Sequence, residues 1–563
     1  MTTATPFRSA ALLAAAALAA CAPLPPTPPP VVEPAPIEPG VAPPPGPYAP
    51  GFDALHYDLD LTLPNTGREI EASARVYIRL TGAGADTLPL DLTGLAVSGV
   101  RVNGAAAGFR YQDGKLRVPV PETAGAGDTL LVEVGYSGTP DDGLIIGANV
   151  HGQRTVFADN WPNRARFWFP SIDHPSDKAS VAFTVRTPPE SGWSVIANGE
   201  GGETEEAGIW RYRTSSPIPT YTMVIGAANF EIRSLGRACG STGAARATCP
   251  EVSWWVFPPD SAHAARVFAR ADEMMIFYSD LIAPYPYHKL AHVQAATRFG
   301  GMENVGAIFY SQQSISARRE IEPTVAHEVA HMWFGNSVTE SDWHHLWLSE
   351  GFASYFGPLF FEHADGTGRF REMMAASARA YLDSEVTGQP IVDPSEGDLF
   401  ALLNRNNYQK GAWVLHMLRG LLGDDAFFRG MRRYHQRYRH GNALSDDLRR
   451  EVELASGREL GWFFQQWLFE PGYPRLRVRW RWDDQSGEVV LTVEQTQPQE
   501  WPAFRFPLEL AFGGADGPLR RTVEVAGKRS QTLLVPLPAR PEFLAVDPDG
   551  WLLKEVEEVA EES

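Results

Sequence analysis

Cysteine is scarce in this sequence, and cationic side chains are outnumbered. Only 3 of the 563 residues are cysteine, and none of them shows the C-x-x-C spacing of a thiolate zinc site or a redox pair. Lysine and arginine number 49 against 68 aspartates and glutamates, which gives a formal net charge of −19. This deficit of positive charge argues against a nucleic-acid partner and against electrostatic binding to anionic lipid.

The N-terminal apolar run is too short to cross a bilayer. It lies within residues 1–20, which hold one arginine, and it ends at Cys21, so we predict a signal peptide there. Leu18-Ala19-Ala20-Cys21 resembles the signal box of bacterial lipoproteins, whose cysteine is lipidated after cleavage. We therefore expect an exported, periplasm-facing protein anchored in the cell envelope through Cys21, with the outer membrane favoured over the inner one. The alternative is a plain secreted precursor.

Composition divides the rest of the chain into segments. Residues 21–50 are dominated by proline, which predicts a semi-rigid extended linker. Short alternating runs between turn residues predict an all-β domain over 51–235, and mixed helix and strand patterns predict an α+β domain over 236–470. Short strands predict a C-terminal β-sandwich over 471–555, followed by a solvated acidic tail at 556–563. The fold class expected is multidomain α+β.

The two remaining cysteines lie close together in the chain. Cys239 and Cys249 flank a loop rich in glycine and alanine. In an exported protein, such a pair predicts a disulfide. The alternative is a pair of free thiols.

One stretch carries the pattern of a metal site. His327, Glu328 and His331 form H-E-x-x-H, and Glu350 follows His331 after 18 intervening residues. On a helix, positions i and i+4 share a face, so both imidazoles can bind one metal ion. We expect helices over 323–334 and 343–360 to bring His327, His331 and Glu350 to one Zn²⁺ per chain. Three protein ligands leave a position for water, and Glu328 can take that water's proton.

A second pattern lies upstream, in Phe299-Gly300-Gly301-Met302-Glu303-Asn304. The glycines allow an extended backbone to approach a ligand whose own backbone pairs with that edge. Glu303 would then be a carboxylate on a substrate-binding strand. Taken alone, it is equally a surface glutamate in a glycine turn.

The two patterns together resemble peptidase family M1, the zinc aminopeptidases. That family combines G-x-M-E-N with H-E-x-x-H-x18-E, in the order and spacing found here. The resemblance extends over most of the mature chain, because FPSIDHPSDKA resembles the family's N-terminal signature and PGYP resembles the entry into its C-terminal β domain. It implies a thermolysin-like catalytic domain over 236–470.

The resemblance also implies a role for each matching residue. His327, His331 and Glu350 would bind zinc, and Glu328 would be the general base. The remaining roles concern the substrate. Glu303 would bind its α-ammonium group, and Gly300, Gly301 and Met302 would lie along its backbone. Phe299 would shape the pocket for its first side chain, and Tyr408, in a Y-x-K-G segment, would donate a hydrogen bond to its oxyanion. Peptides with a free N-terminus are the expected partners, and the sequence does not indicate an oligomeric state.

Two features depart from the family pattern. Trp161 stands where a glutamine or glutamate commonly grips the substrate amine, although Asp159 or Asn160 could take that place. The sequence also holds no segment for the large helical domain that roofs the site in many relatives, so we expect a more open site or one roofed by another chain.

Two other functions stay open at this point. An endopeptidase or epoxide hydrolase would use the same zinc scaffold without needing a free amine. A non-catalytic binding protein of the envelope is the second alternative.

The substitution Glu328→Gln tests the predicted base. We expect zinc to be retained, because Glu328 is not a ligand, while hydrolysis falls by roughly 10²- to 10⁴-fold, the usual contribution of general acid–base catalysis. Metal analysis and steady-state kinetics measure the two quantities. Unchanged turnover would show that the base is misassigned.

Overall fold

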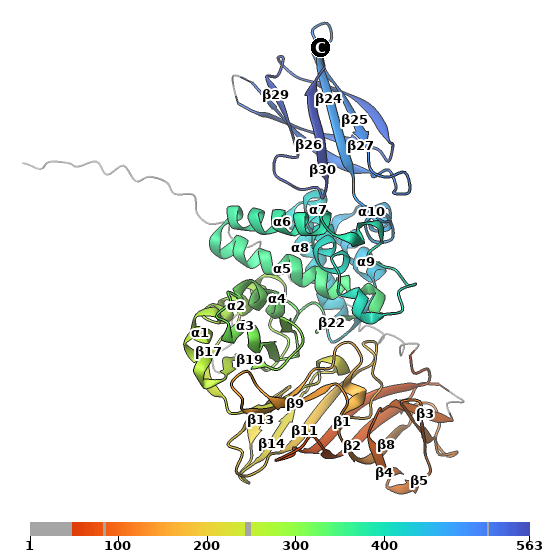
Figure 1. Cartoon of the computed structure of the whole chain (residues 1–563). Coiled ribbons are helices and arrows are strands. Elements are labelled where there is room, and N and C mark those ends of the chain that lie inside the picture. The colour runs from red at the N-terminus through yellow and green to blue at the C-terminus, as the bar shows by residue number, and fades with distance from the viewer. Residues whose placement is uncertain (1–47, 83–85, 242–248, 515–516, 563) are drawn as a thin grey trace, which may run out of the picture. The chain divides into compact units, whose positions relative to one another are not determined.

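A computed structural model describes residues 48–82, 86–241, 249–514 and 517–562 of the chain (Figure 1). The predicted signal peptide, Cys21 and nearly all of the predicted linker lie outside the described residues. Among the residues that are described, no helix is both long and apolar enough to span a membrane.

The chain up to Ala228 is built from β-strands. Its largest sheet runs in the order β13-β14-β11-β1-β2-β8-β4-β5, with β15 beside β11. These strands are β1 (Phe52–Thr62), β2 (Ile70–Leu80), β4 (Ala96–Val102), β5 (Ala105–Ala107), β8 (Thr129–Gly138), β11 (Lys178–Arg186), β13 (Glu200–Glu203), β14 (Ile209–Arg213) and β15 (Ile218–Pro219). Buried and exposed residues alternate along β2, as expected of a sheet with one solvated face.

Two smaller sheets complete this N-terminal part. One runs β12-β16-β10-β9 and the other β3-β7-β6. Their strands are β3 (Thr87–Asp91), β6 (Arg110–Gln112), β7 (Lys115–Pro119), β9 (Leu144–Ala148), β10 (Arg154–Ala158), β12 (Ser194–Ala197) and β16 (Ile225–Ala228). The prediction of a β-rich N-terminal domain is confirmed.

A mixed sheet follows, which we call the central sheet. It runs β17-β18-β19-β21-β20 and leaves β20 at one edge. Its strands are β17 (Glu231–Arg237), β18 (Glu251–Val256), β19 (Lys289–Ala295), β20 (Gly301–Met302) and β21 (Ala307–Ser311). Ala291 and Val293 of β19 belong to the hydrophobic core of the N-terminal strands, whereas Leu290 belongs to that of the helices. The central sheet is therefore buried on both faces.

Helices fill the next part of the chain. They are α1 (Ser261–Val267), α2 (Ala271–Leu281), α3 (Gln312–Ser316), α4 (Glu322–Ala330), α5 (Trp347–Asp365), α6 (Thr367–Leu382), α7 (Gly411–Leu422), α8 (Asp424–Tyr438), α9 (Ser445–Ser456) and α10 (Gly461–Leu468). Two short strands, β22 (Val338–Glu340) and β23 (Gly441–Ala443), pair in parallel among them. This combination of helices and sheet confirms the α+β prediction for the second domain.

The two predicted helices of the metal site exist with shifted bounds. α4 ends at Ala330, four residues before the predicted end, because the following residues form wider turns in which Asn336 N–H bonds to the His331 carbonyl. α5 begins at Trp347, after a 3₁₀ turn η5 (Trp343–His345) that the Asp342 side chain caps.

Two sheets form the C-terminal part. They run β28-β25-β24-β30 and β27-β26-β29. Their strands are β24 (Arg475–Asp483), β25 (Glu488–Gln495), β26 (Phe506–Gly513), β27 (Leu519–Val525), β28 (Ser530–Pro536), β29 (Phe543–Val546) and β30 (Glu555–Glu561). The structure differs here from the predicted acidic tail. Most of this segment forms the exposed strand β30, which pairs in parallel with β24. Arg475 and Arg477 of β24 form ion pairs with Glu555 and Glu558 across the two strands.

Candidate active site

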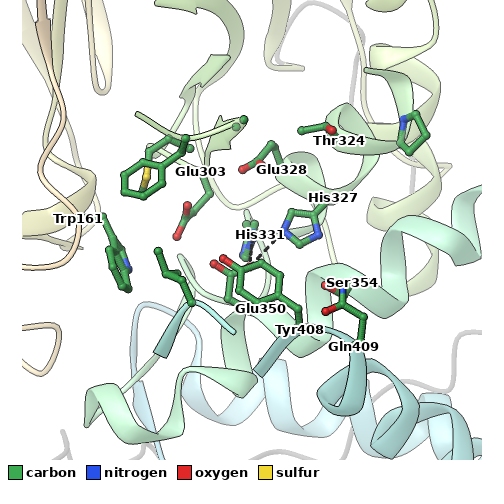
Figure 2. Close-up of a pocket in the computed structure, with 16 residues that line it drawn as sticks. Trp161, Glu303, Thr324, His327, Glu328, His331, Glu350, Ser354, Tyr408 and Gln409 are labelled. Atoms are coloured by element: carbon green, nitrogen blue, oxygen red, sulfur yellow. Dashed lines mark hydrogen bonds and ion pairs between the residues drawn. The ribbon is translucent and has the colours of Figure 1, made fainter. Parts of the chain in front are cut away.

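Three candidate metal ligands meet at one point between α4 and α5 (Figure 2). The Nε2 atoms of His327 and His331 are 3.1 Å apart, and Glu350 Oε2 lies 3.2 Å from the first and 3.5 Å from the second. Tetrahedral ligands at the usual zinc–nitrogen distance stand roughly 3.3 to 3.4 Å apart. These three atoms therefore have the spacing that a zinc ion requires.

Neighbouring groups orient His331 toward that point. Its Nδ1 lies 3.1 Å from the carbonyl oxygen of Phe334 and 3.1 Å from Ser349 Oγ. A proton on Nδ1 that is donated to the carbonyl leaves Nε2 with a free lone pair, which is the form that binds a metal. The donor set and its orientation thus both fit zinc.

The charges around the ligands favour a cation. Burial raises the pKa of the Glu328 carboxyl well above its usual range, and the charges of Glu303 and Glu350 raise it further. Burial would lower the pKa of His331, but the same three carboxylates raise it to about 10. The point where the ligands meet therefore carries negative potential, which a divalent cation would neutralise.

The edge strand β20 brings Gly301 against Glu328. A Cβ at Gly301 would overlap a Glu328 carboxylate oxygen, so a larger residue there would require the Glu328 side chain to shift. The next residues of the strand place Glu303 so that its carboxylate, the Glu328 carboxylate and a His331 nitrogen lie within 4.8 Å of one another. The extended backbone, the predicted base and the predicted amine site are therefore neighbours.

A cavity of about 400 Å³ opens onto these groups. The predicted residues that line it are Phe299, Gly300, Gly301, Met302, Glu303, His327, Glu328, His331, Glu350 and Tyr408. The structure thus places around one cavity every residue predicted to act on a metal or a substrate.

Trp161 forms the wall of the cavity on the far side of Glu303 from the histidines (Figure 2). Its side chain is 2% exposed, and its ring centroid lies 6.0 Å from that of Phe299 and 5.5 Å from those of Trp343 and Phe400. Leu403 also lines the cavity. This wall is therefore apolar and aromatic.

The polar neighbours of Trp161 are engaged elsewhere. Asp159 accepts hydrogen bonds from Arg164 and Thr297, and the Asn160 side-chain amide donates to two main-chain carbonyls. Neither residue lines the cavity. The alternative in which Asp159 or Asn160 reaches a substrate amine is wrong for this structure, because both side chains hold the loop that carries Trp161.

Tyr408 lies in a π-helical turn, η8 (Asn406–Lys410), of the kind often found at functional sites. Its ring stacks parallel to that of His327, with centroids 6.1 Å apart. Gly351 on α5 and Gly411 on α7 touch through their main chains, which brings the turn close to the ligands. Burial, the charge of Glu350 and a hydrogen bond to that carboxylate raise the pKa of Tyr408 well above its usual value, so the phenol keeps its proton.

The sequence analysis missed Tyr221, which approaches Glu303 from the N-terminal part of the chain. This residue is 1% exposed and lies in the 3₁₀ turn η2 (Thr220–Thr222). Burial raises the pKa of Glu303, whereas the charge of His331 and the nearby Tyr221 hydroxyl lower it. That hydroxyl donates its hydrogen bond to the Gly335 carbonyl oxygen at 3.4 Å. No motif marks Tyr221, since it follows an ordinary strand pattern more than 80 residues from Glu303.

Other predicted residues lie away from the ligands. His344 binds Asp342 and a carbonyl at Glu396, and His345 binds Ser445, in keeping with the interpretation that neither is a ligand. The structure joins Cys239 and Cys249 in a disulfide, with Cα atoms 5.3 Å apart.

Comparison with known proteins identifies relatives of the N-terminal β-rich part and of the part that carries the candidate metal ligands. The peptidase family M1 domain matches residues 267–467, and the peptidase M1 N-terminal domain matches residues 53–222. Leucyl aminopeptidase of Saccharolobus solfataricus is 28% identical over 418 residues, which cover 70% of this chain and 51% of the relative.

Two bacterial relatives also align with most of this chain but with only about half of their own length. Aminopeptidase N of Lactobacillus delbrueckii subsp. lactis is 26% identical over 481 residues, or 79% of this chain and 53% of the relative. Aminopeptidase N of Streptomyces lividans is 26% identical over 466 residues, with the same two shares. The chain thus spans about half the length of the curated relatives it matches.

The ligand geometry predicts the effect of Glu350→Gln. Replacing the only charged ligand by a neutral amide should lower the affinity for zinc by at least roughly 100-fold, because charge and basicity are both lost. Competition with a chelator measures the affinity. Glu362→Gln, a change on the same helix at a residue that pairs with Arg419 away from the ligands, should leave it within about twofold. Equal affinities for the two variants would contradict the assignment of Glu350.

Proposed function

Because this chain belongs to peptidase family M1, we propose that it is a zinc-dependent aminopeptidase, which removes single residues from the amino end of peptides. The observation that carries the proposal is the position of Glu303. Its carboxylate lies within 4.8 Å of the predicted base Glu328 and of a His331 nitrogen. In a peptide, the terminal nitrogen and the first carbonyl carbon are only about 2.5 Å apart. An ammonium ion held by Glu303 therefore leaves just the first peptide bond beside Glu328.

The free amine is recognised by charge. A substrate ammonium would donate charge-assisted hydrogen bonds to Glu303, whereas an acylated amine has lost its charge and most of its donors. Glu303 is only 5% exposed, so few water molecules compete for this carboxylate. The selectivity for a chain end thus follows from one buried acceptor.

The substrate backbone would extend along the free edge of β20. Its pairing with Gly301 and Met302 would continue the central sheet, as in strand-addition complexes. Because Gly301 has no side chain, the substrate backbone could approach this edge closely, with its scissile carbonyl beside Glu328. Zinc held by His327, His331 and Glu350 would polarise that carbonyl and acidify water.

Proton transfers fall to Glu328 and Tyr408. Glu328 would take a proton from the attacking water and later give it to the leaving amine, which suits a carboxyl whose pKa burial has raised. Tyr408, protonated and stacked beside His327, would donate a hydrogen bond to the oxyanion as negative charge develops there.

The first side chain of the substrate would be apolar. Phe299, Met302, Leu403 and Trp161 line the cavity. Trp161 lies on the side of Glu303 away from the histidines (Figure 2). A wall of this kind stabilises an aliphatic or aromatic side chain by burial and leaves a charged one without a partner. Leucyl, methionyl and phenylalanyl substrates are the classes that it suits best.

Two structural assignments belong to the same proposal. The helices and the central sheet would form a thermolysin-like catalytic unit. The C-terminal sheets would form a β-sandwich, since Val478 and Leu491 of one sheet share a hydrophobic cluster with Leu508 and Leu510 of the other.

The cellular location is proposed from the lipoprotein box. A lipidated Cys21 would anchor the protein on the periplasmic side of a bacterial membrane. Mass spectrometry of the mature protein from a bacterial host should find a diacylated or triacylated N-terminal cysteine at position 21. A mature protein that begins elsewhere would contradict the anchor.

Acetylation of the substrate tests the function. We expect a peptide with a free N-terminus to be cleaved, its N-acetylated twin to resist cleavage, and a C-terminally amidated twin to be cleaved normally, because only the first change removes the ammonium ion. Equal cleavage of the acetylated peptide would favour an endopeptidase, and no cleavage of any peptide would favour a binding protein.

The same assay applied to Glu303→Gln should lower kcat/KM for the free peptide by roughly 30- to 4,000-fold, the usual effect of removing one partner of a buried charge pair.

A further inference from the structure

Lys178 connects the N-terminal strands to the active site through main-chain carbonyls. It is the first residue of β11, and its ammonium nitrogen lies 2.9 Å from the carbonyl oxygen of Asn336, 3.1 Å from that of Ser337 and 2.7 Å from that of Gly441. Three charge-assisted hydrogen bonds satisfy all the donors of the ammonium group. Lys178 is therefore held in one position, and it fixes the carbonyls it binds.

The segment that Lys178 binds touches both halves of the site. On one side, the Phe334 carbonyl accepts the hydrogen bond that orients His331. On the other side, the side-chain amide of Asn336 donates to the Glu303 carbonyl at 2.5 Å. Asn336 is 0% exposed, so water does not compete for this bond. Residues 334–337 thus link the metal ligand to the predicted amine site.

The contact matters because Glu303 lies just beyond a short edge strand. β20 holds only Gly301 and Met302, and its pairing with β21 ends at Met302. The Glu303 main chain therefore depends on contacts from outside the central sheet. The Asn336 amide supplies one of them, and Lys178 holds the Asn336 main chain in place.

We propose that Lys178 is a positioning residue for amine recognition, which acts through Asn336 to hold Glu303 at the right distance from the metal ligands. In this arrangement the N-terminal β part determines where the substrate ammonium ion binds. The proposal rests on the aminopeptidase function proposed above.

A pair of zinc-binding inhibitors tests the proposal. One is an α-amino hydroxamate with an apolar side chain, and the other is the same hydroxamate without its α-amino group. The wild-type protein should bind the first compound much more tightly, and the ratio of the two inhibition constants measures amine recognition. Lys178→Met should reduce this ratio by roughly 10- to 100-fold, the effect of a misplaced contact group, while the affinity for the des-amino compound stays within about twofold.

Lys289→Met is the matched control. Lys289 is the first residue of β19, and its ammonium group also crosses between the two parts of the chain, where it donates to the Ala197 carbonyl at 2.6 Å. It makes no contact with residues 334–337. The control should keep the wild-type ratio even where it loses thermal stability.

A second variant covers the case in which Lys178→Met does not fold. Asn336→Leu removes the donor to Glu303 and leaves the main-chain carbonyl that Lys178 binds. It should reduce the ratio as Lys178→Met does, and Lys178→Gln, which retains two donors, should restore part of it.

The outcomes separate this proposal from the proposed function. An unchanged ratio in Lys178→Met and Asn336→Leu would overturn the positioning role, as would an equal loss of affinity for both compounds or an equal change in Lys289→Met. A wild-type protein that does not distinguish the two compounds would instead overturn the aminopeptidase function itself.

Discussion

The site depends on holding three carboxylates together out of water. Glu303, Glu328 and Glu350 surround His331, and an isolated buried carboxylate costs several kcal/mol. A cation bound by His327, His331 and Glu350 would offset this repulsion. The hydrogen bond between His331 and the Phe334 carbonyl fixes the imidazole, and Tyr221 donates to the carbonyl of the neighbouring Gly335. The three carboxylates repel one another, and contacts from several segments of the chain hold them in place.

Those contacts explain why two parts of the chain build one site. The central sheet packs one face against the N-terminal strands and the other against the helices. α4 and α5 carry the metal ligands, β20 carries the edge for a substrate, and the N-terminal part supplies Trp161 and Tyr221. The helices carry the candidate metal ligands and most of the cavity lining, and the β-rich part adds Trp161 as one wall.

The sequence predicted that His327, His331 and Glu350 lie together because the constraints on them are local. His327 and His331 are fixed by helical spacing, and α4 and α5 exist near the expected positions. The alternation along strands such as β2 likewise predicted the β-rich domain. Local sequence patterns did not predict elements that form through contacts between distant parts of the chain. Strand β30 forms by pairing with β24, some 80 residues earlier in the chain. The early end of α4, in contrast, comes from local wide turns that the apolar pattern does not reveal.

The cavity wall was the least predictable part. Sequence left Asp159, Asn160 and Trp161 as alternatives, and only the tertiary contacts of Arg164 and Thr297 decide that the polar pair is engaged elsewhere. Tyr221 carried no signal, because a buried tyrosine after a strand looks like core packing.

Substitutions at Gly301 and substitutions in the opposite wall of the cavity would have different effects. A side chain at Gly301 would push against the Glu328 carboxylate, so a substitution here would move the predicted base. Among the described residues, the side chains of Trp161 and Leu403 in the opposite wall form no hydrogen bond or ion pair with the metal ligands or the base. A substitution in this wall would therefore reshape the cavity without moving the groups assigned to the chemistry, so we expect the size of the bound molecule to be easier to change than the reaction.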